Sequence, residues 1–420
     1  TLYTVRYETK DEPKTLRRRK SMIIIEKKED CCGCEVCANA CPKSCIQMER
    51  DEKGFLYPKV DKSRCVDCHI CEKVCPVAEP KIRESAGELK MYGVQNTDER
   101  VRMESTSGGA FSLIANWVLA RQGIVIGAAF DENFRVIHAA ADSEEGAAGF
   151  RGSKYVQSSM GDIYRKVKEW LVRGRWVCFS GTPCQVNGLY KFLNKSFDRL
   201  VTVDIACHGV TSPKFFEQYI RYHSEKEGKK IKEILFREKH YGYGFSTMKV
   251  GFEDGSCYRA GMETDILLRS FFMDLNTRES CHDCRFKTVE RASDFTVFDG
   301  WHTGRFQKDM EDDKGTTLCI LQSDKANKIF AEIREQCRFV EIPVEEGVRL
   351  DGSMILKSTV PNPRREQFFK DISVMDIPEI QDRYYPITWK RRLLAAIKPT
   401  VYRLGLFKYY MKFKEKAGGK

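Results

Sequence analysis

Residues 31–42 are Cys31-x-x-Cys34-x-x-Cys37-x-x-x-Cys41-Pro42, and residues 65–76 repeat the pattern as Cys65-x-x-Cys68-x-x-Cys71-x-x-x-Cys75-Pro76. This spacing holds [4Fe–4S] clusters through cysteine thiolates, and with two such runs the fourth cysteine of each run ligates the cluster of the other run. We therefore expect two clusters with crossed ligand sets. The expected ligands are Cys31, Cys34, Cys37 and Cys75 for cluster I, and Cys65, Cys68, Cys71 and Cys41 for cluster II.

The two runs predict a bacterial-type ferredoxin module over residues 22–80. Between them, residues 48–55 predict a short hairpin with Gly54 in its turn. A disulfide framework suits short secreted domains, and zinc ribbons lack the third cysteine and the Cys-Pro ending. Cys32 and Cys45 fall outside the pattern and are predicted to lie behind the ligands or in the core. The module predicts a protein that moves single electrons.

The chain has 420 residues, which leaves room for two or three domains. Hydrophobic residues make up 42% and charged residues 31%, as in a soluble globular protein. No segment approaches the ~20 consecutive apolar residues of a membrane span, and the first 21 residues lack a secretory signal pattern. Thiolates kept available for clusters predict a reducing compartment, and we expect the cytoplasm.

The net charge of +11 is concentrated at the two ends of the chain. Residues 390–420 carry +9 and residues 1–28 carry +5, so the rest carries −3. A slightly acidic body argues against a nucleic-acid groove, which needs a basic face within the domain. Residues 1–21 lack periodicity and are predicted to be a basic extension or a leader.

Helix and strand patterns alternate over residues 88–345 and predict an α+β protein, in which the ferredoxin module precedes a larger mixed-sheet α/β domain. We find neither a Rossmann nor a P-loop motif. The predicted helices are 110–121, 162–172, 185–193 and 213–224, and the predicted strands are 124–130, 135–139, 176–179 and 201–206.

Four further cysteines lie in predicted loops: Cys184, Cys207, Cys281 and Cys284. Four converging thiolates suit a third [4Fe–4S] cluster or Zn²⁺, although isolated cysteines are often only buried apolar residues. His208 and His282 flank this site and are predicted to donate to a cluster sulfur or a carbonyl group rather than to be ligands. The cysteines predicted to pack in the core are Cys178, Cys257, Cys319 and Cys337.

A glycine-rich entry to a helix, Ser107-Gly108-Gly109, offers free N–H groups and hydroxyl donors. Such an entry suits a pyrophosphate, and the alternative is an ordinary N-cap loop. Gly152-Ser153-Lys154 offers a second set of donors, in which Lys154 could hold a phosphate or stabilise a reduced anionic flavin. The alternative for Lys154 is a solvent-exposed lysine.

Residues 90–345 resemble the coenzyme F420 hydrogenase/dehydrogenase beta-subunit family. The resemblance rests on residues 107–109, 152–158, 181–185 and 207–209, and on Cys281-x-x-Cys284 followed by Arg291-x-x-Asp294. It implies an iron–sulfur flavoprotein that binds FAD through Ser107, Gly108, Gly109, Ser153 and Lys154, with a third [4Fe–4S] cluster on Cys184, Cys207, Cys281 and Cys284. Where relatives tend to have Gly-Asp-Phe-Trp, this chain has Phe298-Asp299-Gly300-Trp301.

Residues 346–420 form a C-terminal extension that ends in a basic tail. Apolar residues among the lysines and arginines of 390–416 suit an amphipathic helix on an anionic membrane surface, which would place the protein at the inner face of the membrane. The alternative is a terminal helix packed on its own domain. We expect Pro399 to break any single long helix.

These features together predict an iron–sulfur flavoprotein oxidoreductase. FAD would exchange electrons with the clusters and with an organic substrate or coenzyme, either an F420-like deazaflavin or a sugar or polysaccharide intermediate. Ferredoxin, reduced deazaflavin or another redox donor would be the partner. The alternative is a non-catalytic electron-relay subunit of a larger redox complex. No catalytic residue is predicted from the sequence.

Overall fold

The computed structural model describes residues 22–81, 88–406 and 409. The predicted extension 1–21 and most of the tail beyond residue 406 lie outside the described residues. The ferredoxin module contains the antiparallel strands β1 (Ile46–Arg50) and β2 (Leu56–Val60), and Gly54 adopts φ 87° in their connection. The predicted hairpin is therefore confirmed. Helices α1 (Val36–Ala40) and α2 (Ile70–Lys73) each follow a residue in the left-handed conformation, Glu35 and His69 respectively.

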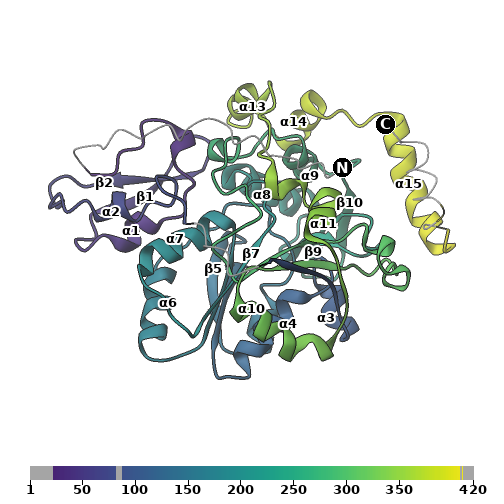
Figure 1. Cartoon of the computed structure of the whole chain (residues 1–420). Coiled ribbons are helices and arrows are strands. Elements are labelled where there is room, and N and C mark those ends of the chain that lie inside the picture. Colours follow the sequence, from purple (N-terminus) through teal and green to yellow (C-terminus); the bar gives the residue numbers. More distant parts are fainter. Residues whose placement is uncertain (1–21, 82–87, 407–408, 410–420) are drawn as a thin grey trace, which may run out of the picture.

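The larger domain is built on an eight-stranded mixed sheet in the order β13-β3-β12-β11-β7-β6-β4-β5 (Figure 1). Strands β4, β6, β7 and β11 are parallel neighbours, and antiparallel strands flank them. The mixed sheet confirms the predicted fold class. The bounds are β3 (Lys90–Asn96), β4 (Ile124–Phe130), β5 (Val136–Ala141), β6 (Val177–Gly181), β7 (Leu200–Ile205), β11 (Phe295–Asp299), β12 (Thr317–Leu321) and β13 (Cys337–Glu341).

Helices cover both faces of this sheet because successive side chains of a strand point to opposite faces. Val125 and Cys178 share a core with α4 (Ala110–Leu119) and α10 (Asp324–Ile333). Ile126 and Val177 share another core with α6 (Ile163–Val172) and α7 (Pro183–Leu193).

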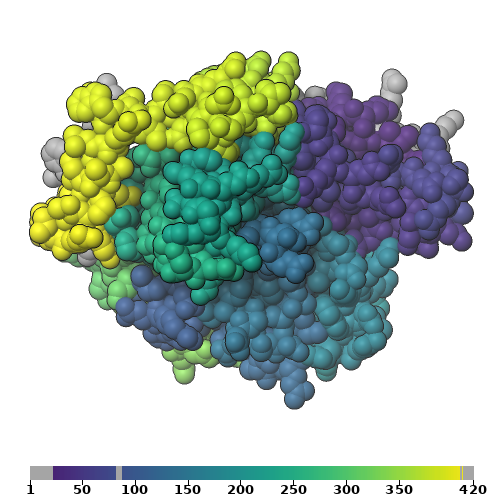
Figure 2. All heavy atoms as spheres, turned by 180° about the vertical axis from the view of Figure 1, so that it is seen from behind, coloured from purple at the N-terminus to yellow at the C-terminus, as the bar shows by residue number. Residues whose placement is uncertain are grey.

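A second, three-stranded sheet has the order β10-β9-β8 and packs against α8 and α9. The remaining bounds are α3 (Glu99–Glu104), α5 (Glu144–Ala148), α8 (Pro213–Glu227), β8 (Ile231–Glu238), β9 (Thr247–Phe252), β10 (Cys257–Gly261), α9 (Ile266–Phe272), α11 (Val344–Asp351), α12 (Ser353–Leu356), α13 (Arg365–Asp371), α14 (Ile377–Tyr384) and α15 (Trp389–Arg403). In Figures 1 and 2 the module and α15 lie at opposite ends of the molecule. No helix among the described residues is long and apolar enough to cross a membrane.

The module is fixed to the larger domain by packing and by hydrogen bonds. Val36 lies in the same core as α6 and α7. The carboxylate of Glu35 accepts from the Met160 N–H at 2.9 Å, and Arg165 donates to the Asn39 carbonyl at 2.7 Å. The module and the sheet are therefore held at a fixed distance from each other.

Three details correct the sequence predictions. Helix α15 continues through Pro399, because proline removes only one helical hydrogen bond and the flanking turns persist. Helix α7 begins at Pro183 rather than at residue 185, because Thr182 and Gln185 form a capping box around its first turn. Cys257 lies half-buried in the edge strand β10, not in the core, unlike Cys178, Cys319 and Cys337.

Candidate functional site

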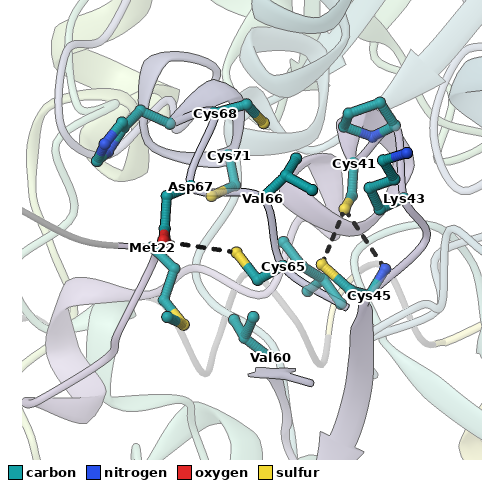
Figure 3. Close-up of a pocket in the computed structure, with 13 residues that line it drawn as sticks. Met22, Cys41, Lys43, Cys45, Val60, Cys65, Val66, Asp67, Cys68 and Cys71 are labelled. Atoms are coloured by element: carbon teal, nitrogen blue, oxygen red, sulfur yellow. Dashed lines mark hydrogen bonds between the residues drawn. The ribbon is translucent and has the colours of Figure 1, made fainter. Parts of the chain in front are cut away.

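The four cysteines expected to hold cluster II border one small apolar pocket in the module: Cys41, Cys65, Cys68 and Cys71 (Figure 3). Ile46 and Val60 of the hairpin and Val66 supply apolar lining, and Lys43, Asp67 and His69 also border the pocket. Cys45, which was predicted to lie behind the ligands, has its sulfur 3.3 Å from that of Cys41. Cys68 is exposed, so this pocket lies at the surface of the molecule.

The cysteines expected to hold cluster I lie at the junction of the module with the larger domain. Burial raises the pKa of Cys37 and of Cys75, and repulsion from the neighbouring Cys31 thiolate raises both further. Cys34 packs against Gly188 of α7, where an added Cβ would lie 3.5 Å from its sulfur. The structure therefore brings residues from both runs together here, in agreement with crossed ligation.

A cavity of about 420 Å³ lies in the larger domain and reaches the module. Its lining includes all four cysteines of the predicted third site and four of the five residues predicted to bind flavin. The cysteines are Cys184, Cys207, Cys281 and Cys284, and the others are Ser107, Gly109, Ser153 and Lys154. Two sites predicted from separate stretches of sequence thus share one cavity.

The parallel strands explain why the cysteines meet. Cys184 follows β6 and Cys207 follows β7, and the carboxyl ends of neighbouring parallel strands lie at one edge of a sheet. Cys281 comes from a distant loop, but an added Cβ on Gly209 would lie 3.5 Å from its sulfur. Burial raises the pKa of Cys207 to about 12, and the neighbouring Cys184 and Cys284 thiolates add to the shift.

Among the described residues, no three side chains of His, Cys, Asp or Glu lie close enough to share one metal ion. A single tetrahedral zinc ion requires sulfur atoms about 2.3 Å from its centre. A four-iron cluster is larger and spaces its thiolates more widely. Whether these four cysteines hold a cluster or one ion stays a prediction from the sequence.

The glycine-rich segment is held in a tight turn. An added Cβ on Gly108 would lie 2.0 Å from the Val94 carbonyl oxygen, and Gly109 adopts φ 84° at the N-cap of α4. The hydroxyl of Thr317 accepts from the Gly108 N–H at 2.8 Å. Only glycine fits at residue 108, which packs against Val94 and Thr317 and does not line the cavity, whereas the neighbouring Gly109 does.

The second predicted flavin segment is bonded to the first. The Ser153 N–H donates to the hydroxyl of Thr106 at 2.7 Å, and the two hydroxyl groups lie 3.0 Å apart. The Lys154 ammonium donates to the carbonyls of Gly149 and Arg151, each at 3.2 Å. No carboxylate within the described part of the chain pairs with Lys154, and burial lowers its pKa to about 8. A cation without a counter-charge thus faces the cavity.

Comparisons with known proteins agree with this architecture. Residues 30–78 match the model of the 4Fe-4S dicluster domain, and residues 174–346 match that of the C terminus of the coenzyme F420 hydrogenase/dehydrogenase beta subunit. The chain carries both domains. The iron–sulfur module and the resemblance expected from the motifs are thus confirmed.

Among solved structures, one similar chain comes from "Xenon derivatization of the F420-reducing [NiFe] hydrogenase complex from Methanosarcina barkeri". The match covers 73% of this chain and 93% of that chain, with 17% sequence identity and a TM-score of 0.41. A comparison with curated proteins finds no match.

Two residues at the cavity were missed from the sequence. Cys32 of the module, predicted to lie behind the cluster ligands or in the core, lines the cavity and shares a hydrogen bond with Cys184. The buried Lys239 ammonium donates to the carbonyl of Ser107 at 2.6 Å and to two others, and so holds the glycine-rich segment. Lysines that bind carbonyl groups carry no sequence signal of their own.

The histidines beside the third site have partners other than those expected. The Nε2 atom of His208 lies 2.8 Å from the Asp274 carboxylate, and that of His282 lies 2.9 Å from the Thr277 hydroxyl. These bonds engage one ring nitrogen of each histidine, and the predicted donation to a cluster sulfur stays a prediction. Trp301, which also lines the cavity, stacks on Tyr243 with 4.2 Å between ring centroids.

Proposed function

We propose that the protein is an iron–sulfur flavoprotein oxidoreductase, with a ferredoxin module over residues 22–80 and an FAD- and cluster-binding domain over residues 88–345. The single observation that carries this proposal is the shared cavity, which is lined by the glycine-rich segment, by Lys154 and by four cysteines. The relation to a hydrogenase beta subunit and the dicluster domain supply the coarser class, an iron–sulfur electron-transfer protein.

The chemistry of the cavity fits FAD. A flavin would link the one-electron chemistry of clusters to the two-electron chemistry of organic substrates. Gly109, which lines the cavity, lets the backbone approach a pyrophosphate, and the N-cap of α4 has no side-chain hydrogen bond, so its first turn presents free N–H groups. Lys154 supplies a positive charge that lacks a carboxylate partner among the described residues, and an anionic group would stabilise it.

Cys184, Cys207, Cys281 and Cys284 would hold the third cluster in the same cavity. Lys287 donates to the Cys207 carbonyl at 2.5 Å and to the Met354 carbonyl at 2.7 Å, which fixes the loop after β7. Cys284 is fixed in a similar way by its N–H, which donates to the hydroxyl of Ser358 at 3.0 Å. Backbone bonds of this kind hold ligands in place before a cluster binds.

The substrate end of the cavity is rich in aromatic rings and cations. Arg237 lies 4.8 Å from the Trp301 ring centroid and pairs with Asp299. A planar, anionic substrate such as an F420-like deazaflavin suits these groups better than a neutral sugar, although we keep a sugar or polysaccharide intermediate as the second substrate class. Ferredoxin or another redox donor would supply the module with electrons.

A non-catalytic relay is the second candidate function, because the matching family model describes a beta subunit. A relay would pass electrons among partner proteins of a complex and would need no organic substrate. The two candidates differ in what the isolated chain can do with a low-potential donor and a dye acceptor.

We also propose a cytoplasmic protein whose helix α15 touches the inner face of the membrane. Trp389 is 70% exposed and Leu393 50% exposed, and they lie one turn apart beside the exposed Arg392. Apolar side chains flanked by cations suit an anionic lipid surface. Co-sedimentation with anionic but not neutral vesicles tests this contact, and Trp389→Ser with Leu393→Ser is expected to abolish it.

The test of the main proposal is anaerobic reconstitution followed by iron and flavin analysis of the full chain. We expect about twelve iron atoms for three clusters and one non-covalent FAD per chain. Reduction of a dye by the isolated chain supports the enzyme, and inert behaviour with all cofactors bound supports the relay. A chain that assembles its clusters and takes up no flavin contradicts the flavoprotein proposal.

A further inference from the structure

Arg278 is a fully buried guanidinium at the junction of the module and the cavity. Its exposed fraction is 0%, and it is among the largest side chains buried to that degree. It donates to the carbonyl of Cys31 at 2.8 Å, to the carbonyl of Leu56 at 3.0 Å and to the side-chain oxygen of Gln157 at 3.0 Å. One side chain thus joins the first cysteine run, the module hairpin and the cavity wall.

No carboxylate pairs with Arg278 in the described part of the chain. The adjacent Glu279 is taken by Lys53 at 2.8 Å and by Arg365 at 3.1 Å. The buried Glu35 carboxylate accepts from the Met160 N–H at 2.9 Å and forms no ion pair with Arg278. The guanidinium instead lies over the ring of Tyr57, 4.1 Å from its centroid. A buried charge without a partner is costly, so a negative charge is expected nearby.

Cysteines expected to bind clusters as thiolates would supply negative charge near Arg278, whose Nε atom donates to the Cys31 carbonyl at 2.8 Å. Burial acts to lower the pKa of Arg278, but electrostatic interaction with Cys31, Tyr57, Cys32 and Cys281 leaves it raised. Cys31 is an expected ligand of cluster I and Cys281 of the third cluster. Arg278 therefore lies between two expected clusters and is a positive charge shared by both.

The corresponding surroundings of cluster II are different. There the sulfur of Cys65 lies 3.7 Å from the Asp67 carboxylate, and the charge of Glu72 adds to the effect of burial in raising the pKa of Cys71. Among the described residues that line this pocket there is one lysine, Lys43, and its side chain is exposed to solvent. Cluster I thus faces a buried cation, whereas the lysine that lines the cluster II pocket, Lys43, is exposed and screened by solvent, and the Asp67 carboxylate lies beside Cys65.

We propose, on the basis of the proposed function, that Arg278 is the internal counter-charge of cluster I and makes it the easier of the two module clusters to reduce. Reduction takes one electron from a low-potential one-electron donor and adds one negative charge to the cluster without a proton. A fixed cation in a low-dielectric region stabilises that added charge, and net charge and hydrogen bonds are among the factors that set cluster potentials.

Burial of cluster I acts in the opposite direction, because a low dielectric disfavours the more negative state. The charge of Arg278 must stabilise the reduced cluster by more than burial destabilises it. An electron that enters at the exposed cluster II would then reside at cluster I, next to the cavity, which assigns an inward direction to electron flow.

The test is a redox titration of the reconstituted full chain, followed by electron paramagnetic resonance. Cys37→Ala identifies the signals of cluster I. In the wild type, cluster I should have the higher midpoint potential. Arg278→Gln should lower the equilibrium constant for its reduction at least tenfold, which is about 59 mV for one electron. Arg278→Lys keeps the charge and should retain most of the wild-type potential.

Arg102→Gln is the matched control, because Arg102 is a similarly buried arginine that has its own carboxylate partner, Asp312 at 2.6 Å. It should leave both module potentials unchanged. An unmoved cluster I potential in Arg278→Gln, or a wild type in which cluster II is reduced first, overturns the role of Arg278. If Arg278→Gln fails to fold, the order of the two wild-type potentials still decides. A wild type without module clusters overturns the proposed function instead, so the two failures are distinguishable.

Discussion

The ferredoxin module and the cavity of the larger domain both gather cysteines, but they do so in different ways. The eight expected ligands of the module lie in one segment, between Cys31 and Cys75. The four cysteines of the cavity come from separate loops between Cys184 and Cys284. The first arrangement is set by local turns. The second depends on the order of the strands in the whole sheet. The difference indicates which substitutions should disrupt one site and leave the other intact.

The largest expected effect is the loss of the third cluster alone. Cys184→Ala removes one ligand and should lower the iron content from about twelve to about eight atoms per chain, while the module clusters keep their spectra. Iron analysis with electron paramagnetic resonance makes the measurement. Cys257→Ser is the control, because Cys257 is half-buried in an edge strand and should leave iron unchanged. Simultaneous loss of the module clusters would show that the two sites do not assemble separately.

Lys154→Met should weaken FAD binding about tenfold to a hundredfold, since a hydrogen bond to a charged group contributes about 1.5–3 kcal/mol. Equilibrium dialysis of the cluster-containing chain provides the affinity. Lys154→Arg keeps the charge and should stay close to wild type. An unchanged FAD affinity in Lys154→Met would show that Lys154 does not contribute to the flavin site.

The same lysine predicts a pH dependence of FAD binding. Burial lowers the pKa of Lys154 to about 8 in the flavin-free protein, and a bound anion would raise it again. Binding then takes up a proton, so the affinity should fall by up to about tenfold per pH unit above pH 8. Burial also lowers the pKa of Lys239, to about 7. A pH dependence that persists in Lys154→Arg would therefore come from Lys239.

Gly33 tests whether the module is independent of the larger domain. Gly33 and Asp67 occupy the same place in the two cysteine runs, and both adopt positive φ, 68° and 47°. An added Cβ on Gly33 would lie 2.0 Å from the Gln157 amide and 2.9 Å from the Arg278 guanidinium. Gly33→Ala should destabilise the protein by about 1–3 kcal/mol. Asp67→Gly should change stability by less. Thermal unfolding of both variants gives the comparison. Equal melting temperatures would mean that the contact between the module and the larger domain adjusts to the added Cβ at little cost.

The smallest effect is expected for the bond between the two flavin segments. Thr106→Val removes the acceptor of the Ser153 N–H and should cost about 1 kcal/mol of stability, with a modest loss of FAD affinity. Calorimetry and dialysis measure the two quantities. Thr97→Val is a control, because the Thr97 hydroxyl is exposed and donates far from the cavity, to the Gln336 carbonyl.

The sequence predicted the features that depend on residues close together in the chain. The module hairpin, the mixed sheet and the strands that precede Cys184 and Cys207 all follow from local patterns. It did not predict that Cys32 would line the cavity or that Arg278 would reach Cys31. These contacts join residues far apart in the chain, and only the docking of the module onto α6 and α7 brings them together. Arginine and lysine are also usually exposed, so a buried one has no signature in a single sequence.

The close fit between Cys34 and α7 has a consequence for the history of the chain. The cysteine-rich segment has the internal repeat of a domain that could be transferred between proteins, but Val36 and Cys34 are part of the core of the larger domain. Gly188 has neighbours on both sides, since an added Cβ would lie 3.0 Å from the Tyr164 hydroxyl and 3.5 Å from the Cys34 sulfur. A ferredoxin domain taken from another protein would not fill the contact between Cys34 and Gly188. The two parts must therefore accept substitutions as a pair, and grafting experiments need to carry helix α7 along with the donor module.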